Sequence, residues 1–96
     1  MKAHQLIQKY GWLQGDRGSK YRGFCLLDAI DSAYSNKVIR KSIQGELCKL
    51  LRLGVFSVVG SGPVTYLYGE ALAKWNDHVG RKASKVIAAL KRIESP

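Results

Sequence analysis

The sequence predicts a mainly α-helical protein, a single small domain over residues 1–96 with four to five short helices and a short β-hairpin. Three observations predict this class. A chain of 96 residues is long enough for one hydrophobic core and too short for two. Apolar residues recur at the spacing of an amphipathic helix along most of the chain. Residues 55–68 differ, because β-branched and aromatic residues dominate there around a Gly-Ser-Gly-Pro turn.

The first helix is expected over residues 3–10, where apolar side chains stand at positions i, i+3, i+4 and i+7 and a glycine follows. The glycine-rich residues 11–23 are expected to form an ordered loop, with Trp12 and Tyr21 packed on the core. Helical spacing returns over residues 24–34, which predicts the second helix.

A third helix is expected over residues 37–53, capped by Ser35 and Asn36, because short polar side chains accept hydrogen bonds from the N–H groups of a first turn. Its apolar stripe consists of Ile39, Ile43, Leu47, Leu50 and Leu51. Its opposite, mainly basic side consists of Lys37, Arg40, Lys41, Gln44 and Arg52. Gly45 indicates close packing or a local break, and Gly54 is expected to end the helix.

Residues 55–68 predict two short strands, and the hairpin is expected to pack on the helices because an isolated hairpin is marginally stable. A short helix is expected over residues 69–75, with Leu72 and Trp75 directed inward. After a turn, the last helix is expected over residues 82–93, and the final three residues are expected to fray.

The charge of the chain is strongly positive. Its 16 Lys and Arg residues exceed its 7 Asp and Glu residues by nine, so the formal net charge is +9. Such a charge attracts nucleic acid, acidic proteins or anionic membranes without choosing among them. A contribution to solubility alone, without a dedicated partner, is the alternative explanation.

The cysteines and the apolar segments indicate a cytoplasmic protein. Cys25 and Cys48 lie among apolar residues and are expected to be buried free thiols in a reducing compartment. Residues 1–10 lack the apolar run of a signal peptide, and no apolar run approaches the roughly 20 residues that span a bilayer. We therefore expect no membrane partner.

The sequence predicts no metal site, no cofactor and no catalytic residue. His4, His78 and two distant cysteines do not have the spacing of zinc ligands. Asp77 and His78 are neighbours, but adjacent residues in a turn usually point apart, and the chain has no G-x-S-x-G motif.

Two glycine-rich segments suggest phosphate binding, but neither carries a phosphate-binding motif. Residues 11–23 lack the G-x-x-x-x-G-K-[ST] motif of phosphate-binding loops, so turn chemistry explains their glycines. Gly60, Ser61 and Gly62 lack it as well. An enzyme remains an alternative if the first loop meets residues 75–81 around Asp77, His78 and Arg17.

Nucleic acid is the partner that the basic residues favour. They form three groups: Arg17, Lys20 and Arg22 in the loop; Lys37, Arg40, Lys41 and Arg52 on the third helix; and Arg81, Lys82, Lys85, Lys91 and Arg92 near the end. Two groups on one face would bind phosphates with a strong salt dependence, whereas solvated helix faces are the alternative. Arg40 and Gln44 are candidates for contacts to base edges, and Tyr21 or Tyr68 for stacking on bases.

Three segments carry a family resemblance: G-W-x-Q-G at residues 11–15, G-x-C-x-x-x-A-I at residues 23–30 and W-N-D-x-x-G-R at residues 75–81. Together they resemble a family of small uncharacterised proteins of actinobacteria and phages. The resemblance implies a mainly helical fold and a phage or prophage origin, but no activity. Lys82 stands where the family pattern has a helix-capping Thr. Asn76 and Asp77 suit a structural turn, because their side chains hydrogen-bond nearby backbone N–H groups.

These observations predict a non-enzymatic binding protein of the host cytoplasm, whose basic surface engages nucleic acid or a nucleic-acid-handling complex. The alternative is a phage-encoded inhibitor that blocks an acidic host protein of defence or transcription through a few desolvated Tyr, Trp and Arg anchors. The two hypotheses differ in salt dependence, because phosphate contacts weaken steeply with salt and an anchor-dominated interface weakens much less.

Overall fold

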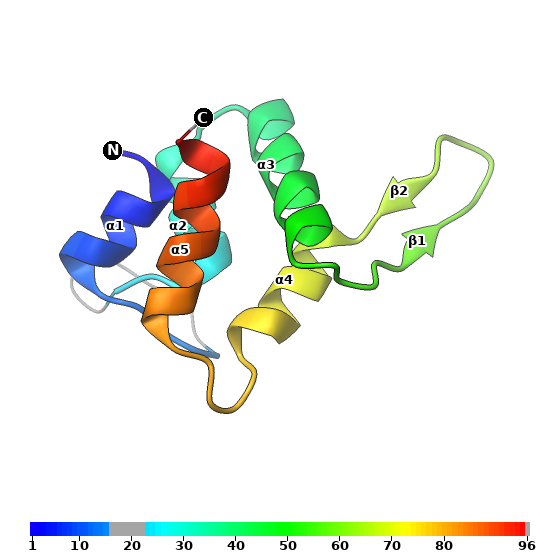
Figure 1. Cartoon of the computed structure of the whole chain (residues 1–96). Helices are drawn as coiled ribbons and strands as arrows, with labels where there is room; N and C mark the ends of the chain where they lie inside the picture. The colour runs from blue at the N-terminus through cyan, green and yellow to red at the C-terminus, as the bar shows by residue number, and fades with distance from the viewer. Residues whose placement is uncertain (16–22, 96) are drawn as a thin grey trace.

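Five helices and one hairpin follow each other in the order that the periodicity predicts (Figure 1). The computed structural model describes residues 1–15 and 23–95. Within them the elements are α1 (Ala3–Tyr10), α2 (Leu26–Ala33), α3 (Lys37–Leu50), β1 (Ser57–Val58), β2 (Thr65–Tyr66), α4 (Tyr68–Asn76) and α5 (Ala83–Glu94). The mainly helical class with a short hairpin is therefore confirmed.

The helices pack around one continuous cluster of buried side chains. Helix α1 packs on α2 and α5, helix α3 packs on α4, and α5 also contacts α3. The largest fully buried apolar side chains are Ile7, Leu26, Ile30, Leu47, Leu72, Val86 and Leu90. Figure 1 shows α5 between α1 and α3, with the two chain ends close together. Of the helices in the described ranges, none is long and apolar enough to cross a membrane.

The start of α3 confirms the predicted cap. Oδ1 of Asn36 accepts hydrogen bonds from the backbone N–H groups of Val38, at 2.8 Å, and Ile39, at 3.2 Å. The predicted apolar stripe is wrong at one position, because Ile39 is 47% exposed. The stripe meets the core one turn later, at Ile43, so the first turn of α3 depends on its cap more than on packing.

The end of α3 differs from the prediction that Gly54 stops it. The last helical residue is Leu50, and Arg52 adopts a left-handed conformation with φ of 54°. The N–H groups of Arg52 and Leu53 donate to the carbonyls of Lys49, at 3.2 Å, and Cys48, at 3.0 Å. These two bonds form a Schellman motif, in which a left-handed residue ends the helix. Arginine therefore occupies a position that glycine usually takes.

The strands of the hairpin add no side chain to the buried core, so the expectation that the hairpin packs on the helices is wrong. Strands β1 and β2 pair antiparallel, and all of their residues are exposed. Figure 1 shows the hairpin projecting from the α3–α4 side, away from the other helices. Its exposed apolar side chains are Phe56, Val58, Val59, Val64 and Tyr66. The strands are two residues long, and the hairpin contacts α4 through the stacked rings of Tyr66 and Tyr68 and through the ammonium of Lys74 over the ring of Phe56.

The C-terminal end does not fray at Glu94, which is the last residue of α5 and is buried. Its carboxylate accepts hydrogen bonds from the backbone N–H of Ala3, at 2.7 Å, and of His4, at 2.8 Å. It also contacts Nδ1 of His4, at 2.9 Å, and accepts a hydrogen bond from the hydroxyl of Tyr34. One carboxylate therefore satisfies the free N–H groups at the start of α1 and joins the two ends of the chain.

Candidate functional site

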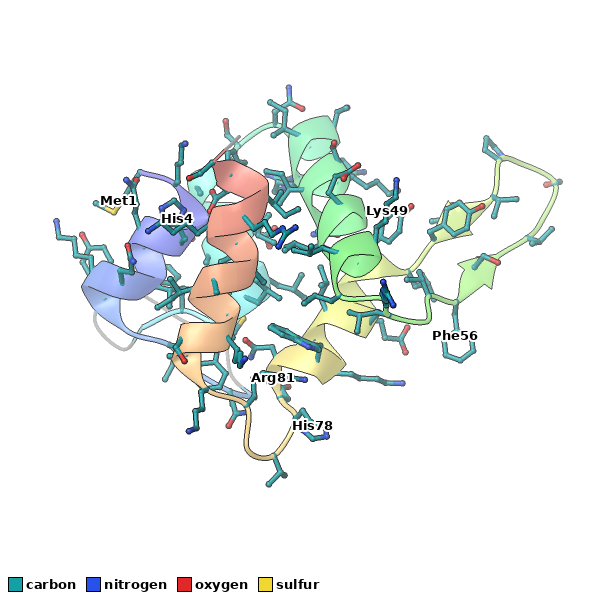
Figure 2. All side chains as sticks on the ribbon, viewed as in Figure 1. Met1, His4, Lys49, Phe56, His78 and Arg81 are labelled. Carbon is teal, nitrogen blue, oxygen red and sulfur yellow. The ribbon has the colours of Figure 1, made fainter. Side chains whose placement is uncertain are left out.

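A groove lies between α3 and the hairpin. Its volume is about 580 Å³. The cations Lys41, Lys49 and Arg52 line it from α3 and the turn that follows. Figure 2 shows Lys49 on the side of α3 that faces the hairpin. Two of these cations, Lys41 and Arg52, belong to the set that the sequence predicts.

Two tyrosines form the opposite wall of this groove. The rings of Tyr66 and Tyr68 are stacked, with centroids 5.8 Å apart and planes inclined by 22°. A Cβ atom at Gly45 would lie 3.4 Å from Cζ of Tyr68, so this ring lies against α3 at van der Waals distance from that position. Helix α3 is unbroken at Gly45, so the predicted alternative of a local break is wrong.

The charge in the groove is positive but not uniform. Glu46 also lines it, among the three cations. Arg52 reaches the groove because its left-handed backbone ends α3 at that point. The thiol of Cys48 lies on the inner wall, where burial raises its pKa and keeps it protonated. Cationic and aromatic side chains thus line the same open space, an arrangement suited to a ligand that combines a planar ring with a negatively charged group.

A second, shallower hollow of about 210 Å³ lies along the same helix. Lys37, Arg40, Lys41 and Gln44 line it, and Lys41 is shared with the larger groove. The third-helix group of the sequence analysis is therefore brought together along one side of α3. Arg40 also has a structural task, because its Nη1 donates to the carbonyls of Tyr34 and Ser35, both at 3.0 Å.

The basic residues near the end of the chain are divided by the structure. Arg81 lies against the end of α4, where its Nε donates to the carbonyl of Trp75 at 2.8 Å. Its guanidinium carbon lies 4.1 Å from the centroid of the Trp75 ring, the geometry of a cation–π contact. The other cations of the group, Lys82, Lys85, Lys91 and Arg92, are exposed at the start of α5 and along it. The described lining of the main groove includes none of these α5 residues.

The third group, Arg17, Lys20 and Arg22, lies outside the described residues, as does Tyr21. Trp12, the other predicted aromatic of the loop, is half-buried against the core as expected.

Lys49 and Tyr66 line the groove but were not predicted as binding residues from the sequence. A signal for Tyr66 exists, because Tyr66 and Tyr68 alternate in an extended segment and so lie on one side of it. Lys49 lies two turns beyond Lys41 and shares its side of the helix only partly, so helical spacing alone favours it weakly. The structure adds it because the hairpin closes the groove on that side.

Residues 11–15 and residues 75–81 meet in space, as the enzymatic alternative requires. Nε2 of Gln14 donates to the backbone carbonyls of Asn76, at 3.0 Å, and His78, at 2.9 Å. The carboxylate of Asp77 accepts hydrogen bonds from the N–H of Gly15, at 2.7 Å, and from Nδ2 of Asn76, at 3.0 Å. Figure 2 shows His78 on the loop between α4 and α5, and its side chain is exposed.

Asn76 connects the three segments that carry the family resemblance, residues 11–15, 23–30 and 75–81. Its Oδ1 accepts hydrogen bonds from Nε1 of Trp12, at 2.7 Å, and from the N–H of Leu26, at 3.1 Å. Its Nδ2 donates to the carbonyl of Leu13 at 3.0 Å. The expectation that this side chain serves its own turn is wrong, because most of its partners lie on distant parts of the chain.

Both cysteines, which lie in the described part of the chain, are free thiols. Sγ of Cys25 caps α2 by accepting a hydrogen bond from the N–H of Asp28 at 3.4 Å. Burial raises the pKa of Cys25 and of Cys48, so both are protonated thiols near neutral pH. These properties are those of structural cysteines.

A match to a protein family covers nearly the whole chain. A model of a protein family, described as a family of unknown function, matches residues 1–95. Searches of curated proteins and of solved structures each returned no match. The family match includes residues 11–15, 23–30 and 75–81, together with α3 and the hairpin. It therefore covers both the Asn76 network and the groove. The chain belongs to the family of unknown function DUF6197.

Proposed function

We propose that this protein is a non-enzymatic binding protein that engages nucleic acid, or a complex that handles nucleic acid, through the basic side of α3. The observation that carries the proposal is the groove that Lys41, Lys49 and Arg52 line together with Tyr66 and Tyr68. Lysine and arginine neutralise phosphates and release counterions, which supplies most of the affinity in nucleic-acid binding. The net charge of +9 adds a long-range attraction for the same partner.

The hydrogen bonds that the Asp77 carboxylate accepts support the proposal that the protein is not an enzyme. This carboxylate accepts one hydrogen bond from the N–H of Gly15, which joins residues 11–15 to the α4–α5 turn, and another from the neighbouring Asn76. A carboxylate engaged in this way serves the fold, whereas a general base needs to reach a substrate proton. The carboxylate of Asp77 and the backbone carbonyl of His78 therefore form part of a structural junction.

The proposed origin is a phage or prophage, and the proposed location is the cytoplasm of the host. The G-W-x-Q-G, G-x-C-x-x-x-A-I and W-N-D-x-x-G-R segments support this origin through their resemblance to phage and actinobacterial proteins. The two protonated free thiols are compatible with a reducing compartment.

Titration of labelled oligonucleotides at two salt concentrations tests the proposal. The variant Lys41→Gln/Lys49→Gln removes two groove cations, and Lys85→Gln/Arg92→Gln removes two exposed cations of α5. The groove variant is expected to bind at least about tenfold more weakly at low salt and to lower the salt slope by about two, roughly one for each phosphate that a lysine no longer neutralises. The α5 variant has the same net charge and is expected to bind nearly as well as the original protein.

Two results would contradict this proposal. Absence of binding to single- and double-stranded DNA and RNA at low salt would exclude nucleic acid as the partner. Equally weakened binding in the two variants would show that the total charge, and not the groove, determines the affinity.

A specific observation favours the second candidate, an inhibitor that blocks a host protein. Phe56 and Val59 on the hairpin are 72% and 74% exposed, and projecting apolar side chains are typical anchors of protein interfaces. Figure 2 shows Phe56 extending from the hairpin into solvent. In this case Phe56→Ser would abolish capture of the host protein, the complex would resist salt, and Lys41→Gln/Lys49→Gln would leave it intact.

A further inference from the structure

We infer that the groove between α3 and the hairpin binds single-stranded nucleic acid, with an unpaired base stacked on Tyr66. This inference rests on the proposed nucleic-acid function and narrows it to one class of ligand. A single strand is the favoured ligand for two reasons. The exposed side chains around the groove are suited to stacking on unpaired bases, and the volume of the groove is that of a pocket for a small ligand.

The tyrosine pair supplies a platform for a base. Tyr68 is half-buried, and its ring lies against Gly45 of α3, so it is held in place. Tyr66 stacks on Tyr68 and is 49% exposed, so part of its ring remains open to a ligand. A base on Tyr66 would extend an existing stack without a rearrangement of the protein. Stacking on an aromatic side chain tolerates any base, because each base has a π-face.

The cations of the groove are spaced along α3 in a way that suits the phosphate backbone of a nucleic acid. Lys41 and Lys49 are eight residues apart on α3, which corresponds to about 12 Å along the helix axis. Arg52 follows Lys49 at the end of the helix. A backbone that passes along α3 would therefore meet successive positive charges while its bases point toward the hairpin, as in single-strand grooves in general.

The volume of the groove limits what enters it. At about 580 Å³ it lies within the range of about 300 to 1,000 Å³ that is typical of pockets for small ligands. That space suits one or a few nucleotides of a flexible strand. A paired base keeps both of its faces in the duplex stack and cannot place one on Tyr66 without being extruded.

The composition of the hairpin argues against duplex recognition by the hairpin itself. A two-stranded ribbon can enter the major groove, where it reads base edges with hydrogen-bonding side chains such as Arg, Asn or Gln. The exposed side chains on and beside this hairpin include Phe56, Val58, Val59 and Val64, which make no such contacts. Apolar and aromatic side chains are suited to the faces of unpaired bases.

The test compares labelled 12-nucleotide dT and rU strands with a duplex of the same length, measured by fluorescence anisotropy. The single strands are expected to bind at least about tenfold more tightly than the duplex. Tyr66→Ala is expected to weaken single-strand binding by about fivefold or more, in line with the removal of one stacking platform. Tyr66→Phe keeps the ring and is expected to retain the affinity, and Val59→Ala serves as a matched hairpin control without an effect. The dT and rU strands show whether the groove distinguishes DNA from RNA.

A gain of affinity provides a second test that loss of folding cannot imitate. Glu46 lines the groove and repels phosphates, so Glu46→Gln is expected to bind the single strand about twofold to fivefold more tightly. Preference for the duplex, or an unchanged affinity in Tyr66→Ala, would overturn the inference while the proposed nucleic-acid function stands. Absence of binding to any of the oligonucleotides would overturn both.

Discussion

Nε1 of Trp12 donates a hydrogen bond to Oδ1 of Asn76 over 2.7 Å, between residues 64 positions apart in the chain. Asn76 is 1% exposed, and the same oxygen also accepts from the backbone N–H of Leu26. The side chain thus holds the loop after α1, the start of α2 and the end of α4 together. A buried amide of this kind stabilises a fold because each of its partners would otherwise be unpaired.

Replacement of Asn76 is expected to be strongly destabilising. Asn76→Ala leaves the indole N–H of Trp12 and the buried N–H of Leu26 without an acceptor, so the free energy of unfolding should fall by about 3 kcal/mol. Urea unfolding measures this change. Asn36→Ala removes the cap of α3 at an exposed position and should cost only about 1 kcal/mol. Equal destabilisation of both variants would show that the Asn76 network contributes no more to the free energy of unfolding than an exposed helix cap does.

Gly23 is expected to tolerate no side chain. Its φ is 98°, and a Cβ atom there would lie 2.8 Å from the backbone carbon and oxygen of Gly11. Gly23→Ala should therefore lower the free energy of unfolding by about 3 kcal/mol, because both backbone strain and overpacking contribute. Gly60→Ala is the matched control, since a Cβ there meets no described atom within 4 Å, and it should change stability by less than about 0.5 kcal/mol. Thermal unfolding of the two variants makes the comparison.

The Glu94 network predicts a loss of stability in acid. Burial alone would raise the pKa of Glu94, but hydrogen bonds from Tyr34, His4 and Ala3 hold it below its ordinary value of 4.5. A folded pKa below the unfolded value means that the stabilisation is present above pH 4.5 and is lost as the pH falls through the folded pKa. Glu94→Gln should cost about 2 kcal/mol at neutral pH, and the difference from the original protein should shrink below pH 4.5. Chemical unfolding across this range measures the difference, with Glu46→Gln as an exposed control. A difference that stays constant with pH would contradict the prediction.

The same network predicts a loss of stability in alkali through Tyr34. Burial, together with the hydrogen bond to Glu94 and its negative charge, raises the pKa of the Tyr34 phenol far above its ordinary value of 10.0. A raised folded pKa means that the stabilisation is fully present below pH 10 and is lost as the pH rises beyond it. Tyr34→Phe removes this titration, so its stability should fall less steeply above pH 10 than that of the original protein. Chemical unfolding at a series of alkaline pH values measures both slopes, and parallel slopes would exclude Tyr34 as the cause.

The start of α5 offers a stabilising substitution. Lys82 occupies the N-cap position with an extended backbone, but a lysine side chain has no acceptor for the N–H groups of the first turn. Lys82→Thr should therefore raise the free energy of unfolding by about 1 kcal/mol, as measured in urea. Lys85→Thr makes the same change of charge inside the helix and should lower stability by roughly 0.5 kcal/mol. A rise in both variants would point to relief of charge repulsion instead of capping.

The helices were predictable because their signals are local. The spacing of apolar residues predicted the bounds of α1, Ala3–Tyr10, without error, and Asn36 indicated where α3 begins. The end of α3 was not predictable in the same way. Arg52 takes the left-handed position there, although glycine at position 54 is the residue that usually marks such an end.

The candidate site was predictable only in part. Lys37, Arg40 and Lys41 were expected on one side of a helix, and they line one hollow. The contribution of Lys49 and Tyr66 depends on how the hairpin lies beside α3, which no spacing along the chain indicates. Arg81 was expected to be a binding residue, but its Nε is engaged by the carbonyl of Trp75.

By itself the sequence determined the helical class, most helix bounds, the hairpin and the sign of the charge, because these depend on composition and on residues a few positions apart. Only the tertiary structure decided which polar side chains become buried and which cations face aromatic rings. Glu94 accepts a hydrogen bond from the N–H of His4, 90 positions away in the chain, and Asn76 accepts one from the indole of Trp12, 64 positions away. The physical reason is that a polar group can be buried only where a partner from another element satisfies it, and long-range packing brings that partner.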